Sequence, residues 1–436
     1  MNRLLACFLL LITLALASLI LPAVAESPNP SKPFAIINVR VFDGADLIPK
    51  AIVLVRDGKI AAVGPKVTVP EGAEVVDGGG GTLLPGFIDA HTHSFTESLR
   101  RALVFGVTTE LDMFTDPAFA RSARAEQAAP GGVADRADLF SAGSLATVPE
   151  GHGTEYGLPA PPITRPEDAQ AWVDARLAEG SDYIKIVDET GATFNLKIPT
   201  LSPPTIAALI RAAHKRGKLA VVHISSQVSA LRAIESGADG LVHLFADSPP
   251  DPDFIQSVVR HKAFIIPTLT VLQSTTASGM ASGKGLTVDP RLKDYLTQGE
   301  IANLMQWAKG NGELKYASET VRKLRDAGAP VLAGTDAPNP GTAHGVSIHR
   351  EMELLVEAGM TPQQALAAAT SVPANAFRLK DRGRIAPGLR ADLVLVSGDP
   401  LQDITATRGI VRIWKGGKPV ARPQAAEPNM AALSRP

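Results

Sequence analysis

Two histidines separated by one residue end a short apolar stretch, and their spacing is suited to metal binding. His91 and His93 close the segment Gly86-Phe87-Ile88-Asp89-Ala90-His91-Thr92-His93. Side chains alternate between the two faces of a β-strand, so a strand here places both imidazoles on one face. Two imidazoles that project together from a strand end form half of a typical zinc site. The purely structural alternative is a pair of packed or solvent-facing histidines.

Four further polar residues lie within or near the ends of other apolar stretches. Lys185 interrupts the run Tyr183-Ile184-Lys185-Ile186-Val187, although a lysine is rarely buried without a partner. His223 and His243 each follow two aliphatic residues, and Asp336 follows Gly334-Thr335. Each residue alone is explained more simply by packing. Their recurrence on several predicted strands, together with the histidine pair, indicates a single site.

The elements that must position these residues alternate between strands and helices, which is typical of a parallel α/β architecture. Eight strands are predicted: the first ends at His93, and the others are Gly106–Met113, Ala137–Ser144, Tyr183–Asp188, Leu219–Ser225, Gly240–Phe245, Phe264–Val271 and Pro330–Ala337. Helices are predicted over Glu167–Glu179, Pro204–Arg216 and Leu314–Ala327. Eight such units favour a TIM (β/α)8 barrel, whose active site lies at the C-terminal ends of the strands. A doubly wound open sheet is the alternative.

Short β-type runs also stand towards both ends of the chain. Turn pairs such as Asp57-Gly58 separate the N-terminal runs, which is a hairpin signal. Neither end has enough strands for a stable sheet of its own. We therefore predict one small β-sandwich from residues 26–85 and 381–422, a barrel domain over 86–380, and a flexible tail over 423–436.

The first residues have the pattern of a secretory signal peptide. Met1-Asn2-Arg3 precedes the apolar run Leu4–Leu21, and Ala23-Val24-Ala25 forms an A-x-A cleavage site. This pattern predicts removal of residues 1–25 and a periplasmic or secreted protein. An uncleaved anchor is the alternative, since the run is long enough to span a bilayer. Cys7 is the only cysteine, so the mature chain offers neither a disulfide nor a cysteine ligand.

The charge balance is almost neutral. Lys and Arg number 43 against 44 Asp and Glu, a formal net charge of -1. This balance argues against nucleic acid or an acidic membrane as a partner. We expect a small-molecule substrate and no stable membrane association after signal cleavage. The sequence leaves open whether the protein forms a homo-oligomer.

In their order along the chain, these motifs resemble the amidohydrolase superfamily, in the branch whose binuclear centre is bridged by a carboxylated lysine. The matching residues are Pro85-Gly86-Phe87-Ile88-Asp89-Ala90-His91-Thr92-His93, Lys185, His223, His243 and Gly334-Thr335-Asp336. The resemblance covers essentially the whole mature chain. Within the superfamily, the sequence is similar to imidazolonepropionase-like and prolidase-like members. It implies that His91, His93 and Asp336 hold one metal ion. It further implies that His223 and His243 hold a second ion, with N6-carboxylated Lys185 bridging both.

The implied ligands suit two divalent ions, with Zn²⁺ first and manganese, cobalt or iron as alternatives. A water that bridges two cations is largely hydroxide at neutral pH. Asp336 is implied to take its proton and deliver it to a leaving amine. The resemblance thus predicts an exported hydrolase of amide-type C–N bonds, first of all in dipeptides or N-acyl amino acids. Lactone, ester or phosphotriester hydrolysis is the second prediction, and a non-catalytic metal- or ligand-binding barrel is the third.

The residues that would face a substrate lie in the loops after the strands. His152, in Gly151-His152-Gly153, is predicted to have a catalytic role by contacting the substrate carbonyl oxygen. Tyr183 shares a strand face with Lys185, and His344 follows the eighth strand, so both are predicted to line the pocket. Weaker candidates are Tyr156 and Thr268.

The remaining polar features are predicted to be structural or are left open. Three further histidines, His214, His261 and His349, are read as structural because they lie in or beside predicted helices. Residues 273–311 form a long polar stretch with a predicted helix over Tyr295–Lys309. This stretch is predicted to be either a lid over the pocket or a surface helix without a catalytic part.

Overall fold

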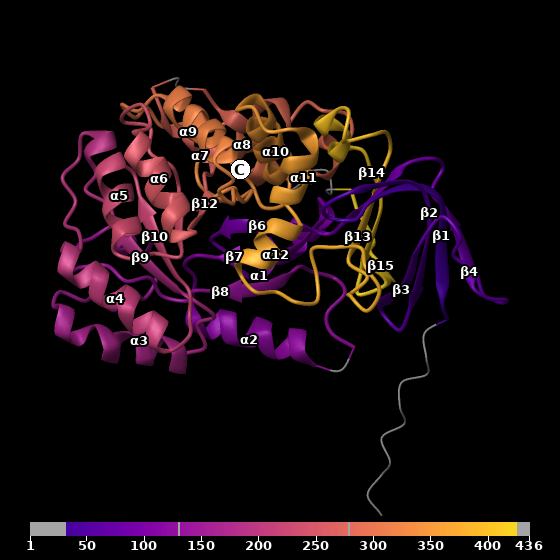
Figure 1. Cartoon of the computed structure of the whole chain (residues 1–436), viewed down its shortest axis with the longest axis horizontal. Coiled ribbons are helices and arrows are strands. Elements are labelled where there is room, and N and C mark those ends of the chain that lie inside the picture. The colour runs from indigo at the N-terminus through magenta and orange to yellow at the C-terminus, as the bar shows by residue number, and fades with distance from the viewer. Residues whose placement is uncertain (1–31, 130, 278–279, 425–436) are drawn as a thin grey trace, which may run out of the picture. The chain divides into compact units, whose positions relative to one another are not determined.

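The strands from the two ends of the chain pair with each other. The computed structural model describes residues 32–129, 131–277 and 280–424. Among these residues, one mixed sheet has eight strands in the order β15-β14-β13-β5-β1-β2-β3, with β4 paired to β1 (Figure 1). Their bounds are β1 (Phe34–Phe42), β2 (Leu47–Arg56), β3 (Lys59–Gly64), β4 (Glu74–Asp77), β5 (Thr82–Pro85), β13 (Leu393–Val396), β14 (Ile410–Lys415) and β15 (Lys418–Pro419).

This arrangement corrects the predicted β-sandwich in one respect. The expected partnership between the two ends is present, because β13 runs antiparallel to β5 with Leu395 opposite Leu83. However, hydrogen bonds join the strands into a single sheet, edge to edge, since β5 also pairs with β1. The predicted signal peptide and residues 425–436 of the predicted tail lie outside the described residues.

The central strands are all parallel to their neighbours. They form a three-stranded sheet, β6-β7-β8, and a four-stranded sheet, β12-β11-β10-β9. Isolated bridges connect Ala146 with Ile186, Ile265 with Val331, and Thr92 with Ala337. These bridges close the pairing into a circuit, the order expected of an eight-stranded parallel barrel. The strands are β6 (Phe87–Thr92), β7 (Val107–Asp112), β8 (Asp138–Ser141), β9 (Ile184–Asp188), β10 (Ala220–Ile224), β11 (Gly240–Val242) and β12 (Phe264–Ile266).

Helices follow most of these strands and cover them (Figure 1). For example, α4 begins with Pro203 directly after Ser202, whose hydroxyl accepts a hydrogen bond from the Thr205 N–H. Ile206, Leu209 and Ile210 on one face of this helix are buried, and the helix contacts β9 and β10. The helices are α1 (Thr96–Val104), α2 (Pro117–Ala128), α3 (Ala169–Ala178), α4 (Pro203–Lys215), α5 (Gln227–Glu235), α6 (Pro252–His261), α7 (Leu269–Thr275), α8 (Gln298–Leu304), α9 (Leu314–Asp326), α10 (Ser347–Glu357), α11 (Pro362–Ala368) and α12 (Ser371–Ala376). Short 3-10 turns are η1 (Thr154–Tyr156), η2 (Pro166–Asp168), η3 (Ala192–Phe194), η4 (Ser282–Gly285), η5 (Lys293–Tyr295) and η6 (Ile404–Arg408).

The predicted strands 137–144 and 240–245 are shorter in the structure, as β8 and β11, and two others differ more. The seventh stops at Ile266, because Thr268 has a positive φ of 49° and α7 begins at Leu269. The eighth, 330–337, forms no regular strand. Its first residues nevertheless hydrogen-bond to β12 through the backbone, and its later residues hydrogen-bond to β6. Its last turn places Asp336 at a φ of 60°, which ends an extended conformation. The three predicted helices are present with bounds shifted by one or two residues, as α3, α4 and α9.

A buried ion cluster joins the terminal sheet to β8. The Asp138 carboxylate accepts hydrogen bonds from Arg382 and Arg390, both at 2.6 Å, and lies 2.9 Å from the Lys415 Nζ. Burial alone would raise the pKa of Asp138, but the three cations lower it to about 2. The charged carboxylate therefore persists at neutral pH and holds the two parts of the fold in register.

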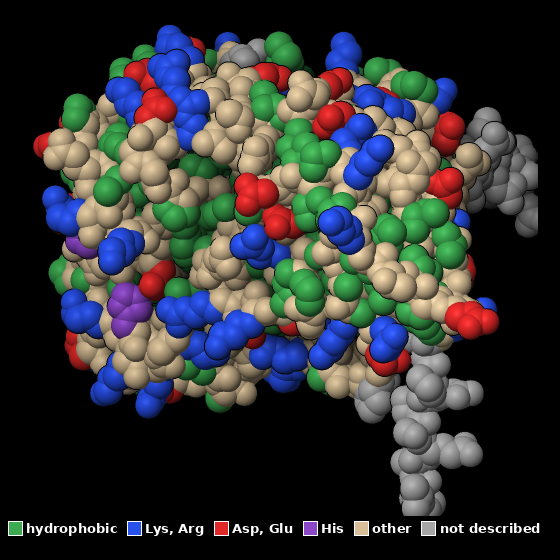
Figure 2. Space-filling view, turned by 45° about the vertical axis from the view of Figure 1, so that its right-hand side comes forward, with side chains coloured by type: hydrophobic (Ala, Val, Ile, Leu, Met, Phe, Trp, Pro, Cys, Tyr) green, Lys and Arg blue, Asp and Glu red, His purple; other side chains and the backbone are tan. Residues whose placement is uncertain are grey.

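The surface carries both charge signs. On the face seen in Figure 2, lysine and arginine side chains are interspersed with acidic and hydrophobic ones. Within the residues that the structure describes, no helix has both the length and the apolar character needed to cross a bilayer.

Candidate metal centre and substrate pocket

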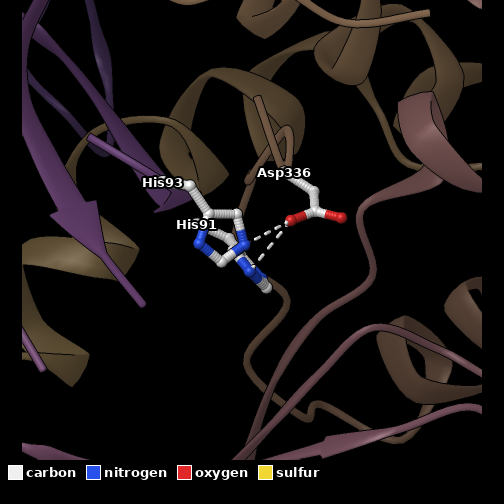
Figure 3. A group of neighbouring side chains, drawn as sticks. All are labelled: His91, His93 and Asp336. Carbon is white, nitrogen blue, oxygen red and sulfur yellow. Dashed lines mark ion pairs between the residues drawn. The ribbon is translucent and has the colours of Figure 1, made fainter. Parts of the chain in front are cut away.

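His91, His93 and Asp336 converge at the end of β6. Their candidate ligand atoms all lie within 4.8 Å of one another (Figure 3). The Asp336 Oδ1 is 3.2 Å from the Nε2 of His91 and 3.1 Å from the Nε2 of His93. The backbone N–H of Asp336 donates to the carbonyl oxygen of His91, which brings the two segments together. Two imidazoles and a carboxylate at these distances form a metal-binding group.

The donor atoms of this group are left without hydrogen bonds. Both ring nitrogens of His91 and the Oδ1 of Asp336 are buried and have no hydrogen-bond partner. Buried polar atoms are nearly always satisfied, so such a cluster needs an explanation. A divalent cation would satisfy the Nε2 of His91 and the Oδ1 of Asp336, because each of these two atoms can supply a lone pair. The residues present therefore fit the metal that the predicted ligand set requires.

The other three predicted ligands lie beside this group. The ring of His243 is 4.7 Å from that of His91 and 4.6 Å from that of His223. Lys185 is 2% exposed and lines one cavity together with His223, His243 and Asp336. Burial lowers the pKa values of all three histidines well below the usual range, so their imidazoles are neutral, the form that binds metals. Burial also lowers the pKa of Lys185 to about 7, against the opposing effects of Asp336 and Asp112.

Backbone conformation helps to aim these side chains. His243, Thr268 and Asp336 have positive φ angles of 72°, 49° and 60°. Residues other than glycine seldom adopt this region, and such conformations concentrate at functional sites. The three lie where β11, β12 and the eighth parallel segment end. Each segment therefore turns sharply at the residue that faces the site.

Two buried acidic residues support the histidines, and the sequence reasoning did not single them out. Asp89 accepts hydrogen bonds from the Thr335 N–H, the Thr335 hydroxyl and the His91 N–H, and so links β6 to the segment that carries Asp336. Glu189 lies 3.3 Å from the His223 Nε2 and is 5% exposed. Asp89 had a signal, since it shares the i, i+2 spacing of His91 and His93. Glu189 also had a signal, since it directly follows β9, at the strand end where such a barrel places its active site.

Thr268, a weaker candidate from the sequence, contacts the predicted metal-binding residue His243 and does not line the cavity. Its hydroxyl is 2.7 Å from the Nδ1 of His243, which leaves the Nε2 of that ring as the ligand atom. Such contacts orient a histidine ligand, and their loss typically costs about 10–100-fold in metal affinity. We expect Thr268→Val to weaken metal binding by this factor in a chelator competition. Thr268→Ser keeps the hydroxyl and should bind normally; equal losses in both variants would show that packing, not the hydrogen bond, matters.

His152 and Tyr156 lie at the cavity as the sequence suggested. The Nδ1 of His152 is 2.7 Å from the Glu155 carboxylate, and its ring is 4.7 Å from that of His223. Tyr156 stacks against His93 at 6.4 Å. Both residues line the same cavity as Lys185. Since Glu155 engages one nitrogen of His152, the other is available to a substrate carbonyl oxygen.

The structure does not bring Tyr183 or His344 into the cavity lining. The Tyr183 hydroxyl donates to the carbonyl oxygens of Asp112 and Phe140, so it lies deeper between the strands than Lys185. The Nδ1 of His344 is 2.8 Å from the Glu110 carboxylate, and the residue is 4% exposed. Strand alternation gave the correct face for Tyr183 but not its depth.

The histidines that were predicted to be structural have structural partners. His214 contacts Asp239 at 2.8 Å, His261 contacts the Ser257 carbonyl oxygen, and His349 contacts Thr407 and the Phe105 carbonyl oxygen. None of them is in the cavity lining of the described chain.

Among the described residues of 273–311, those that line the cavity lie near the start of the stretch. Thr275 and Thr276 line it, as does Gly312 just beyond the stretch. The middle of the stretch packs against α1 and the segment around Val346 through buried leucines. Arg101 of α1 also binds the Glu300 carboxylate through two hydrogen bonds. The predicted helix over 295–309 is shorter, α8.

Comparison with known proteins agrees with this geometry. The model of the amidohydrolase family matches residues 82–420, most of the chain. The chain belongs to this family. This amidohydrolase is thus a metal-dependent hydrolase that acts on C–N bonds, with His91, His93 and Asp336 as a candidate metal site.

Individual relatives of the amidohydrolase are distant but span its length. An imidazolonepropionase of Deinococcus deserti is 27% identical over 391 residues, which cover 84% of this chain and 91% of the relative. Among solved structures, a putative prolidase from Bifidobacterium longum has a TM-score of 0.72 and 26% identity, and the match covers 93% and 98% of the two chains. A Xaa-Pro dipeptidase with bound methionine has a TM-score of 0.69 and 21% identity over 89% and 99%. These structural neighbours imply a TIM barrel.

Proposed function

We propose that this amidohydrolase cleaves an amide-type C–N bond at a binuclear centre. His91, His93 and Asp336 would hold one divalent ion, and His223 and His243 a second, with Lys185 carboxylated on its Nζ between them. Zn²⁺ suits this set of four imidazoles and two carboxylate-type groups. The observation that carries the proposal is the convergence of all six side chains: five line one cavity, and the sixth, His91, contacts three of them.

Lys185 supports the proposal through its chemistry. An ammonium group has no lone pair for a metal, whereas a carbamate is an anionic donor with two oxygens. A pKa of about 7 leaves a large neutral fraction of the amine at neutral pH. The neutral nitrogen can attack CO2, form the N–C bond and release one proton. Burial of this amine costs free energy. Attraction between the buried carbamate anion and the metal cations would offset that cost.

The protein groups have separate parts in the proposed reaction. When bound, divalent ions polarise the scissile carbonyl and make water a better nucleophile. Asp336 accepts a proton from the attacking water and passes it to the leaving nitrogen. In its imidazolium form, with the Nδ1–H held by Glu155, His152 would donate its Nε2–H to the carbonyl oxygen as negative charge develops there.

The substrate and the cellular location are the finer parts of this proposal. Relatives and neighbours carry names as different as imidazolonepropionase, Xaa-Pro dipeptidase, molinate hydrolase and phenylurea hydrolase B, so the names select no single substrate. A dipeptide or an N-acyl amino acid is the first substrate class to assay. We also propose that the protein is exported, on the signal-peptide pattern of residues 1–25.

Amine release from a panel of dipeptides, N-acyl amino acids and neutral amides tests the proposed function. We expect the zinc-loaded protein to release amine from at least one class, and a chelator to stop the reaction. Activity that survives metal removal would contradict the proposal. Cleavage of esters or lactones alone would replace it with the second prediction from the sequence.

A further inference from the structure

We propose that the substrate of this site is an uncharged, largely apolar amide that carries no free carboxylate group. This inference rests on the proposed cleavage of an amide-type C–N bond, and it favours neutral amides over the dipeptides and N-acyl amino acids predicted first from the sequence. It follows from what the cavity wall offers beyond the predicted metal ligands and His152.

Most of the wall is hydrocarbon. Two phenylalanine rings and a set of aliphatic side chains come from strand ends, loops and α7 and surround the space next to the ligands. They include Phe114, Leu145, Phe194, Ile198, Leu244 and Leu272. Contact with such a wall favours apolar groups in proportion to the area removed from water. It gives nothing to a charged group, which loses its hydration there.

Apart from the proposed metal ions, the described wall offers no cationic Lys or Arg side chain to bind a carboxylate. Among the described residues that line the cavity, there is no arginine, and Lys185 is the only lysine. Lys185 is buried among the predicted ligands and is assigned to the metal centre. A dipeptide or an N-acyl amino acid presents a carboxylate close to the scissile bond. Recognition of that group in a partly dry pocket normally uses a guanidinium or ammonium group.

Among the described wall residues outside the predicted ligands, Glu189 is the only Asp, Glu, Lys or Arg, and its carboxylate has the same charge sign as a substrate carboxylate. Glu189 is 5% exposed, and its Oε1 accepts a hydrogen bond from the Gly191 N–H. Its Oε2 faces His223 at 3.3 Å. An anionic substrate group beside Glu189 would meet repulsion that the low local dielectric strengthens. The remaining polar wall groups include neutral hydroxyl and amide side chains such as Ser225 and Asn339, which suit an uncharged polar group.

Two lysines in nearby segments do not supply the missing charge. Lys197 adjoins the wall residue Ile198, and Lys309 lies in the segment that leads to Gly312, but both side chains are exposed and outside the lining. Ion pairs in water contribute little to recognition because solvent and salt screen them. Lys197 therefore provides a control for the experiment.

A pair of substrates that differ only in the carboxylate tests the inference. N-phenylacetyl-phenylalanine and N-phenylacetyl-phenethylamine share the acyl group, the scissile bond and the phenyl ring. We expect kcat/KM to be at least about 100-fold higher for the neutral compound. Equal or better cleavage of the carboxylate would overturn the inference.

Binding measurements distinguish a failure of this inference from a failure of the proposed function. Calorimetry of both compounds on the Asp336→Asn protein compares their dissociation constants without turnover. Tighter binding of the neutral compound without cleavage by the unaltered protein would retain the inference and remove the proposed function. Failure of both compounds to bind would overturn the inference.

Two variants examine the wall itself. Phe194→Arg adds a cation at the half-exposed cavity edge and should shift the kcat/KM ratio at least about 10-fold towards the carboxylate compound. Lys197→Ala should leave the ratio unchanged. A ratio that moves in Lys197→Ala would identify the exposed lysine as a carboxylate anchor and contradict the inference.

Discussion

Asp336→Asn is expected to lower kcat by about 10²–10⁴-fold, the range typical of a lost general base. Asparagine has the same shape and keeps one oxygen donor, but its amide cannot accept the proton that Asp336 is proposed to move. Asp336 is also buried and held by the backbone of His91, so the variant should retain its fold. Initial rates on the best amide of the panel, with metal content measured on the same sample, check this result.

A matched control is another buried aspartate that takes no part in the site. Asp289 is 7% exposed and pairs with Arg291 and Arg408 outside the cavity lining. Asp289→Asn should lower the free energy of unfolding but leave kcat unchanged. Full activity in Asp336→Asn with normal metal content would show that another group moves the proton.

Lys185→Ala is expected to have a comparable effect for a different reason. Loss of the proposed bridge removes a ligand from both ions, so the metal content should fall from two ions per chain towards one or none. We expect kcat/KM to fall at least about 10³-fold, since a catalytic metal contributes several kcal/mol to the transition state. Metal analysis after gel filtration gives the stoichiometry. Short carboxylic acids such as formate or acetate should restore part of the activity by filling the space of the carbamate.

The second buried lysine of the structure provides the control. Lys415 is 1% exposed and lies near Asp138 at the terminal sheet, away from the cavity. Lys415→Ala leaves a buried carboxylate with one fewer cation and should lower stability. Its metal content should remain two ions per chain. If Lys185→Ala also kept two ions, the carbamate assignment would be wrong.

The sequence by itself determined which residue types stand at the ends of the strands. The period of two along a strand placed His91 and His93 on one face, and the aliphatic runs before His223 and His243 located those residues. These are local properties, because a strand's face depends only on neighbouring residues. The assignment of Asp336 followed the same logic, although the segment around it proved not to be a regular strand.

The distances between site residues and their depth in the barrel depend on how distant segments pack together, which local patterns do not show. The sequence reasoning did not single out Glu189, which lies beside His223, and it could not show that Tyr183 lies below the cavity instead of lining it. The apolar wall is assembled from segments far apart in the chain, such as η3 with Phe194 and α7 with Leu272. Distances between such segments follow from the closure of the parallel strands and from side-chain packing, neither of which leaves a periodic signal. For that reason the chemistry of the ligands was predictable from the residues, whereas the shape and charge of the substrate pocket were not.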